Sequence, residues 1–75
     1  MIKSHIITIG DEILSGHISD TNAKWLSEKL YSIGVNTSKR ITISDDKKQI
    51  KKTLKLSINN SDIIIVTGGL GPTND

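Results

Sequence analysis

The stretch IIIVTGGLGPT at residues 63–73 decides the fold. Its opening run of branched apolar residues is typical of a parallel-sheet strand that is covered on both faces. Gly68, Gly69, Gly71 and Pro72 follow directly. Glycines at the carboxyl end of a strand let backbone amides approach an anion, because no Cβ stands in the way. The stretch therefore predicts a phosphate or ligand loop after a buried strand, with a tight turn as the plainer alternative.

Two further strands and two helices are expected upstream of this stretch. Residues 5–9 form a β-branched run that Gly10 ends, and residues 35–43 alternate apolar with polar side chains, as in an edge strand with one wet face. Apolar residues recur at helical spacing between the strands, at Ala23, Leu26, Leu30 and Ile33 and again at Ile50, Leu54 and Ile58. The order β-α-β-α-β predicts an α/β fold with a three-layer parallel sheet. The wet second strand and the dry first and third strands suggest strand order 2-1-3.

Short polar residues mark the turns between these elements. Residues 11–20 are polar and are expected to form a loop. Asp20 or Thr21 is predicted to cap the first long helix, and Gly34 to end it. The acids after residue 43 are cap candidates for the second helix. The sequence stops inside the glycine loop, where a further helix is expected, so it looks cut short.

Composition narrows the class of protein. The chain has 75 residues, a formal net charge of +2 and no cysteine. It is expected to form one small domain, without thiol chemistry or cysteine-bound metals, and the absence of cysteine fits the cytoplasm. No apolar run reaches the ~18 residues of a membrane span. With one Trp, one Tyr and no Phe, the chain lacks stacking platforms for nucleic acid.

Carboxylates follow the predicted strands at the edge where the glycine loop lies. Gly10, Asp11 and Glu12 end the first strand, Asp45 ends the second, and Asp75 closes the chain. Because Mg²⁺ prefers oxygen ligands and bridges to phosphates, the acids beside a phosphate loop suggest a magnesium site. The alternative is that they are helix caps or solvated loop charges.

Other polar residues favour plainer interpretations. Lys48, Lys51, Lys52 and Lys55 are expected to be the solvated face of the second helix rather than a nucleic-acid patch. His5 and His17 have no spacing that suggests a metal site, and His5 is expected at the end of a strand.

Several motifs together resemble a known family. The stretches ITIGDEIL at 7–14, GHISDTN at 16–22, SDD at 44–46 and TGGLGPT at 67–73 closely resemble, in order and spacing, the start of competence/damage-inducible protein A (CinA). The N-terminal domain of that family is an α/β/α fold similar to the molybdopterin-binding domains of molybdenum-cofactor biosynthesis. By this resemblance, residues 1–75 are the N-terminal half of such a domain.

The resemblance also implies a site. The implied ligand-binding residues are Gly10, Asp11, Glu12, Asp20, Thr21, Asn22, Gly68, Gly69, Gly71, Pro72 and Thr73, with Asp11 and Glu12 as ligands of a divalent metal. Asp45 and Asp75 are the implied catalytic acids. The implied ligand is ADP-ribose-like or molybdopterin-like, the implied reaction is metal-dependent hydrolysis of an ADP-ribose-type pyrophosphate, and full-length members form homo-oligomers. The chain departs from the family in ending at the first acid of a pair.

Three interpretations remain open at this point. The chain is a metal-dependent pyrophosphatase, a non-catalytic module for a pterin or nucleotide, or a truncated product without a function of its own. The preferred expectation is a half-domain that has family-type ligand binding and in which catalysis is in doubt.

Overall fold

The computed structural model describes residues 1–16 and 20–68. Strand β1 (Ile2–Ile9) leads into the short helix α1 (Asp11–Leu14), and the elements that follow are helix α2 (Thr21–Ser32), strand β2 (Val35–Ile43), helix α3 (Lys47–Asn60) and strand β3 (Ile63–Gly68). The predicted alternation of strands and helices is confirmed. The expectation of a loop throughout residues 11–20 is wrong, because the chain makes one helical turn directly after β1.

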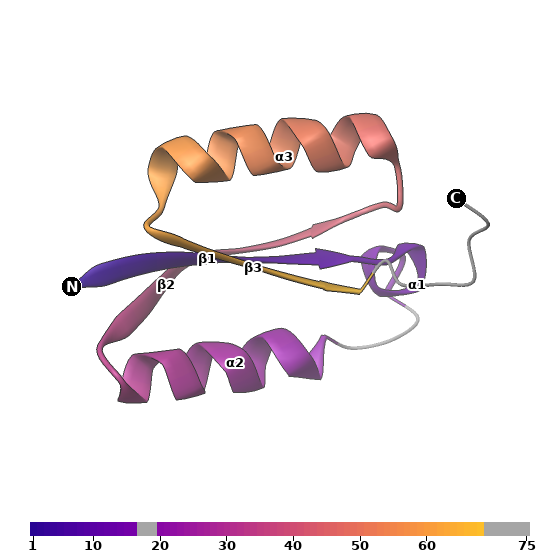
Figure 1. The fold of residues 1–75 in the computed structure, drawn as a ribbon. Helices are drawn as coiled ribbons and strands as arrows, with labels where there is room; N and C mark the ends of the chain where they lie inside the picture. Colours follow the sequence, from indigo (N-terminus) through magenta and orange to yellow (C-terminus); the bar gives the residue numbers. More distant parts are fainter. Residues whose placement is uncertain (17–19, 69–75) are drawn as a thin grey trace.

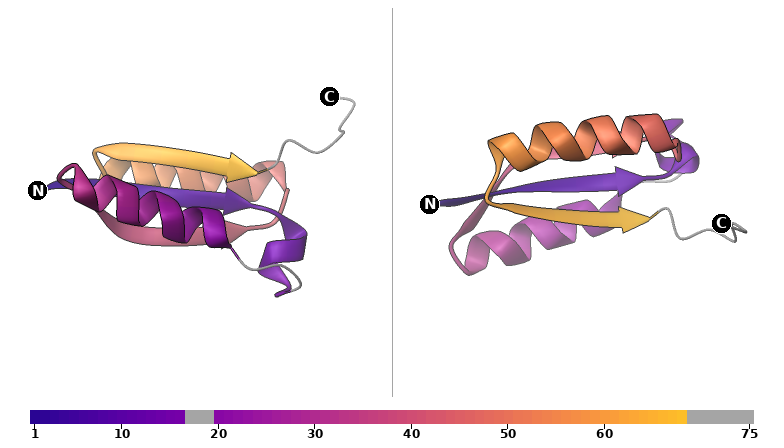
Figure 2. Two further views of the ribbon diagram at one scale, coloured as in Figure 1. Left: turned by 90° about the horizontal axis from the view of Figure 1, so that it is seen from below. Right: turned by 45° about the horizontal axis from the view of Figure 1, so that its top comes forward.

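The sheet is parallel, with the order β2-β1-β3 that the sequence predicts. Helix α2 covers one face and helix α3 the other, which gives three layers (Figure 1). The arrowheads of the strands point to the same side, so the carboxyl ends form one edge (Figure 2). The α/β three-layer prediction is confirmed.

The core lies mainly between the sheet and α3. Ile7, Ile9 and Ile43 form its buried centre, and the half-buried residues packed on it are Ile41, Ile50, Leu54 and Ile64. On the other face, Ala23 is the buried residue of α2. The predicted apolar stripe of α3 is correct for its first two members only, because Ile58 is 65% exposed.

Strand β3 is less buried than its sequence predicts. Its residues Ile63, Ile64 and Ile65 are half-buried, and Val66 is 45% exposed. The physical reason is that, among residues 1–16 and 20–68, β3 pairs with β1 alone and is an edge strand. An edge strand keeps one row of backbone groups without a ladder partner.

A bulge in β2 changes which face its side chains occupy. The β1–β2 register shifts after Ser4, which pairs with Thr37, so that His5 pairs with Lys39 and Ser38 is the extra residue. The Ser4 and Thr37 hydroxyls lie 3.0 Å apart, whereas Lys39 lines a cavity with His5. Thr37 and Lys39 therefore lie on opposite faces, although simple alternation would place them on the same face.

The lysines of α3 face solvent, as predicted. Lys48, Lys51, Lys52 and Lys55 are all exposed. Within the two described stretches of chain, every helix is too short or too polar to cross a membrane.

Candidate functional site

The carboxyl ends of the strands meet at one edge of the sheet. Ile9 of β1 pairs with Ile43 on one side and with Gly68 on the other. The Gly10 amide donates a hydrogen bond of 3.0 Å to the Ile43 carbonyl, which extends the pairing one residue past β1. The predicted convergence of Gly10, the end of β2 and the start of the glycine loop is confirmed. The candidate residues Gly69, Gly71, Pro72, Thr73 and Asp75 lie outside the described residues.

Gly68 allows an unusually close approach of two backbones. Its φ of +79° is in the left-handed region, which favours glycine. A Cβ built on Gly68 would lie 2.2 Å from the carbonyl oxygen of Ile9 and 3.2 Å from its carbonyl carbon. These neighbours are backbone atoms that cannot rotate away, so no other residue fits without moving a strand. The first glycine of the loop thus sets how close β3 lies to β1 at the candidate site.

Helix α1 places two carboxylates beside this point. Asp11 and Glu12 form its acidic first turn, and both are exposed. A Cβ on Gly10 would lie 2.9 Å from Glu12 Oε1, so this side chain folds back over the end of β1. Gly10 has a φ of 171°, extended backbone that any residue adopts, and Glu12 can rotate. Both acids are therefore available to a ligand at the edge.

Asp20 has a structural role that the sequence shows only in part. Its Oδ1 accepts a hydrogen bond of 3.1 Å from the Ala23 amide and caps α2, as predicted. Its Oδ2 accepts a bond of 2.5 Å from the hydroxyl of Thr8, a residue of β1 that is 2% exposed. Thr21 and Asn22 follow as exposed residues in the first turn of α2. Asp20 thus ties the start of α2 to the central strand near the candidate site.

The two acids after β2 have different roles. Asp46 caps α3, because its Oδ2 accepts a hydrogen bond of 3.0 Å from the Gln49 amide. Asp45 is exposed, with no hydrogen bond of its side chain among those described. Of the pair, Asp46 therefore stabilises the helix, and Asp45 is the acid without a described structural role.

The acids fit part of a magnesium site. Residues 1–16 and 20–68 contain no group of three or more His, Cys, Asp or Glu side chains that could hold a metal ion. Asp11 and Glu12 nevertheless offer two neighbouring carboxylates. Magnesium is commonly held by one or two carboxylates, while water and substrate phosphates complete the coordination. The side chains present therefore match magnesium that is shared with a phosphate better than a permanent structural metal.

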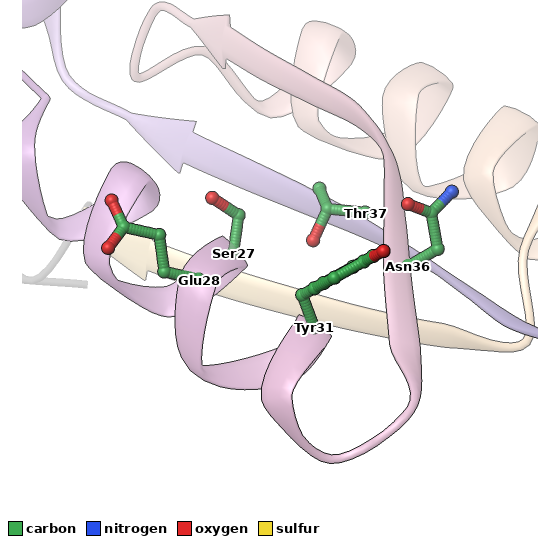
Figure 3. Close-up of a pocket in the computed structure, with 5 residues that line it drawn as sticks. All are labelled: Ser27, Glu28, Tyr31, Asn36 and Thr37. Carbon is green, nitrogen blue, oxygen red and sulfur yellow. The ribbon is translucent and has the colours of Figure 1, made fainter.

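One hollow lies away from this edge. It has a volume of about 320 Å³ between the second half of α2 and the first residues of β2. Tyr31, one of its lining residues, extends from α2 towards β2 (Figure 3). Its other lining residues are Ser27, Glu28, Asn36 and Thr37. Because Asn36 and Thr37 begin β2, the hollow is near the amino edge of the sheet. It brings together none of the predicted site residues.

The buried pair of His5 and Ser57 was not predicted from the sequence. His5 was expected at the end of a strand, but it lies within β1, where it is 4% exposed and contacts Ser57 of α3. The strand begins three residues earlier than its β-branched run indicates, which explains the error. The burial of Ser57 could have been predicted, because its spacing from Ile50 and Leu54 places it on the face of α3 that meets the sheet.

Comparisons with known proteins agree with this architecture. A family model described as a probable molybdopterin binding domain matches residues 5–75. A CinA-like protein of Flavobacterium psychrophilum is 47% identical over 74 residues, which are 99% of this chain and 18% of that protein. A putative competence-damage inducible protein of Natranaerobius thermophilus is 49% identical over 70 residues, 93% of this chain and 17% of that protein. The chain thus spans less than a fifth of these relatives.

Solved structures show the same fold. A CinA protein from Thermoplasma acidophilum, described as of unknown function, is 32% identical with a TM-score of 0.90, covering 96% of this chain and 43% of that one. The molybdopterin biosynthesis enzyme MoaB of Thermus thermophilus is 27% identical with a TM-score of 0.84, covering 99% and 48%. These matches confirm the resemblance to CinA that the motifs indicate, and the chain belongs to the molybdopterin binding domain family.

Proposed function

We propose that the carboxyl edge of the sheet binds a small phosphorylated ligand of the molybdopterin or ADP-ribose type. The close approach of Gly68 to the Ile9 carbonyl carries the proposal. It brings the start of the glycine loop next to Gly10 and the acids of α1, so backbone amides and carboxylates can act on one group. In open α/β sheets, ligands bind outside the carboxyl ends of the strands.

Backbone amides and carboxylates would bind different parts of the ligand. Amides of the loop at residues 68–73 would hold one phosphate, since glycines leave these donors unobstructed. Asp11 and Glu12 would hold a divalent cation, for which magnesium is our candidate. When bound, the cation would neutralise negative charge on the phosphates.

The finer form of the proposal is hydrolysis of an ADP-ribose-type pyrophosphate. Asp45 and Asp75 are the proposed catalytic acids, and the exposure of Asp45 just after β2 supports a role in orienting a water molecule. The second candidate is a non-catalytic module that holds a pterin, favoured by the 27% identity to a molybdopterin biosynthesis enzyme. For either candidate we propose a cytoplasmic location, homo-oligomers for the full-length protein, and no nucleic-acid or membrane partners.

We propose that residues 1–75 are the N-terminal half of a longer domain. The chain covers 43% and 48% of the two solved relatives, although nearly all of it aligns with them. We therefore expect binding to be retained more readily than turnover by residues 1–75.

Titration calorimetry tests the binding proposal. The chain is titrated with ADP-ribose with and without Mg²⁺, and AMP release is followed in parallel. We expect heat of binding that depends on Mg²⁺ and is weaker for Asp11→Ala. Glu28→Ala is the matched control, because it removes an exposed acid at the hollow near the other edge.

The possible results separate the candidates. Binding with AMP release supports the pyrophosphatase, and binding without it supports the module. A flat titration of folded chain with both ADP-ribose and a pterin phosphate contradicts the proposal. Equal affinity of the Asp11→Ala variant would show that Asp11 is not a metal ligand.

A further inference from the structure

A buried imidazole joins the central strand to helix α3. His5 Nδ1 lies 2.8 Å from Ser57 Oγ, a hydrogen bond between residues that are 52 positions apart in sequence. His5 is 4% exposed and Ser57 is 1% exposed. Buried polar pairs of this kind must be kept together, because a separated partner loses its hydrogen bond without gaining water.

The surroundings of the imidazole disfavour a positive charge. A small cavity of about 160 Å³ lies beside His5, between α3 and β2. Helix α3 contributes uncharged polar groups from Thr53 and Asn60 to its wall, and β2 contributes Lys39 as the only charged side chain among the described residues that line it. On the other side, β3 presents Ile64 as the cross-strand neighbour. The described residues that line the cavity include no carboxylate that could compensate the positive charge of protonated His5.

The same surroundings affect the proton affinity of His5. Burial first, and then the positive charge of Lys39, lower the pKa of the imidazole below its ordinary value of 6.5. Protonated His5 could still donate to Ser57, so the hydrogen bond is not what disfavours the proton. The cost arises from an uncompensated charge on a largely buried ring next to another cation.

The second half of α3 depends on this contact more than the first half does. Ile50 and Leu54 hold the first half on the core of Ile7, Ile9 and Ile43. Beyond Leu54 the apolar side chains Leu56 and Ile58 are 57% and 65% exposed, and Ser57 is the buried residue of the helix. Opening this half would expose a charged imidazole to water.

We propose that the His5–Ser57 contact is a proton-operated latch, which holds the second half of α3 on the sheet while the imidazole is neutral and releases it when the imidazole is protonated. The latch lies apart from the carboxyl edge. It would make the order of α3 depend on pH without changing the candidate ligand residues.

The direction of the pH effect follows from the lowered pKa. The unfolded chain takes up the proton on His5 near pH 6.5, whereas the folded chain takes it up only at lower pH. The latch therefore contributes fully to the stability of the closed α3 above pH 6.5. This contribution is lost as the pH falls through the lower pKa that His5 has in the folded chain. Between the unfolded and folded pKa values of His5, the ratio of closed to open α3 falls by up to about tenfold per pH unit.

NMR of the 75-residue chain between pH 8 and pH 4.5 tests the proposal. The chain has two histidines, so the His5 ring signals can be assigned by difference from a His17→Asn variant. We expect His5 to titrate below 6.5. Amide exchange at residues 53–60, corrected for its intrinsic pH dependence, should accelerate as His5 protonates, while exchange in α2 follows the pH less steeply.

Two variants complete the test. His5→Asn keeps a hydrogen-bonding group near the position of Nδ1 but cannot titrate, so exchange in α3 should lose this pH dependence. Lys39→Gln removes an exposed charge and should raise the His5 titration midpoint with the fold intact. The proposal is overturned if His5 titrates at 6.5 or above in the folded chain, if exchange at residues 53–60 ignores its titration, or if His5→Asn keeps the wild-type pH response.

Discussion

Replacing Gly68 by alanine tests the geometry on which the candidate site depends. The new Cβ would lie 2.2 Å from the Ile9 carbonyl oxygen, a distance that non-bonded atoms do not adopt. The contact can be relieved only if the end of β3 moves away from β1, because the obstructing atoms belong to the backbone. That movement would also displace the start of the glycine loop from Gly10.

The magnitude has two contributions. A left-handed backbone conformation costs a residue with a Cβ about 1–2 kcal/mol relative to glycine. Forcing an extra methyl group into a filled space typically costs about 1–3 kcal/mol. The sum is about 2–5 kcal/mol. A chain of 75 residues is expected to have a folding free energy of about 4–11 kcal/mol, so the substitution removes a large part of it.

Urea unfolding followed by circular dichroism measures this loss, and the chain contains a matched control. Gly34 has a φ of +88°, close to that of Gly68, but a Cβ there meets no atom within 4 Å. Gly34→Ala should therefore show only the conformational contribution, and the difference between the variants isolates the contact with Ile9. Equal losses of stability in the two variants would refute the close approach of β3 to β1.

Three further predictions concern the polar contacts and the bulge. Asp20→Ala should lower the free energy of unfolding by about 2 kcal/mol or more, since it removes a cap and leaves the buried Thr8 hydroxyl unpaired. Asp46→Ala, which removes only an exposed cap, should cost about 1 kcal/mol in the same urea experiment, and equal losses would contradict the role of Thr8. Ser57→Ala should cost about 1–3 kcal/mol at pH 8, where the neutral imidazole loses its partner; an unchanged denaturation midpoint would show that water replaces the hydroxyl. Deleting Ser38 removes the bulge without turning either half of β2 over, so unfolding should remain cooperative, and a loss of cooperativity would show that the bulge is needed.

The order of the elements could be predicted because each has a local signal. Helix α3 begins at a capping acid and carries Ile50 and Leu54 one turn apart, and β1 contains a β-branched run that a glycine ends. Such features act within a few residues, so a sequence without coordinates displays them. The strand order was inferred from a wet second strand and dry first and third strands. The order is correct, although β3 is itself an edge strand and is less buried than that inference assumed.

Contacts between distant residues could not be predicted in the same way. The bond between Thr8 and Asp20 and the bond between His5 and Ser57 join residues 12 and 52 positions apart, and each depends on how a helix is placed against β1. Gly68 was recognised as a loop glycine, but its role in strand spacing appears only when the Ile9 carbonyl is placed beside it.

Two side-chain hydrogen bonds of β1, one buried and one part-buried, together explain how the helices are positioned on the sheet. Successive side chains of a strand point to opposite faces, so Thr8 lies on the face of α2 and His5 on the face of α3. Apolar packing alone tolerates sliding, whereas a buried hydrogen bond is satisfied at one position only. The Thr8 bond fixes the first turn of α2 near the carboxyl edge, and the His5 bond fixes the second half of α3 away from it. Ligand binding should therefore depend strongly on the first contact and weakly on the second, because only the first holds backbone that borders the candidate site.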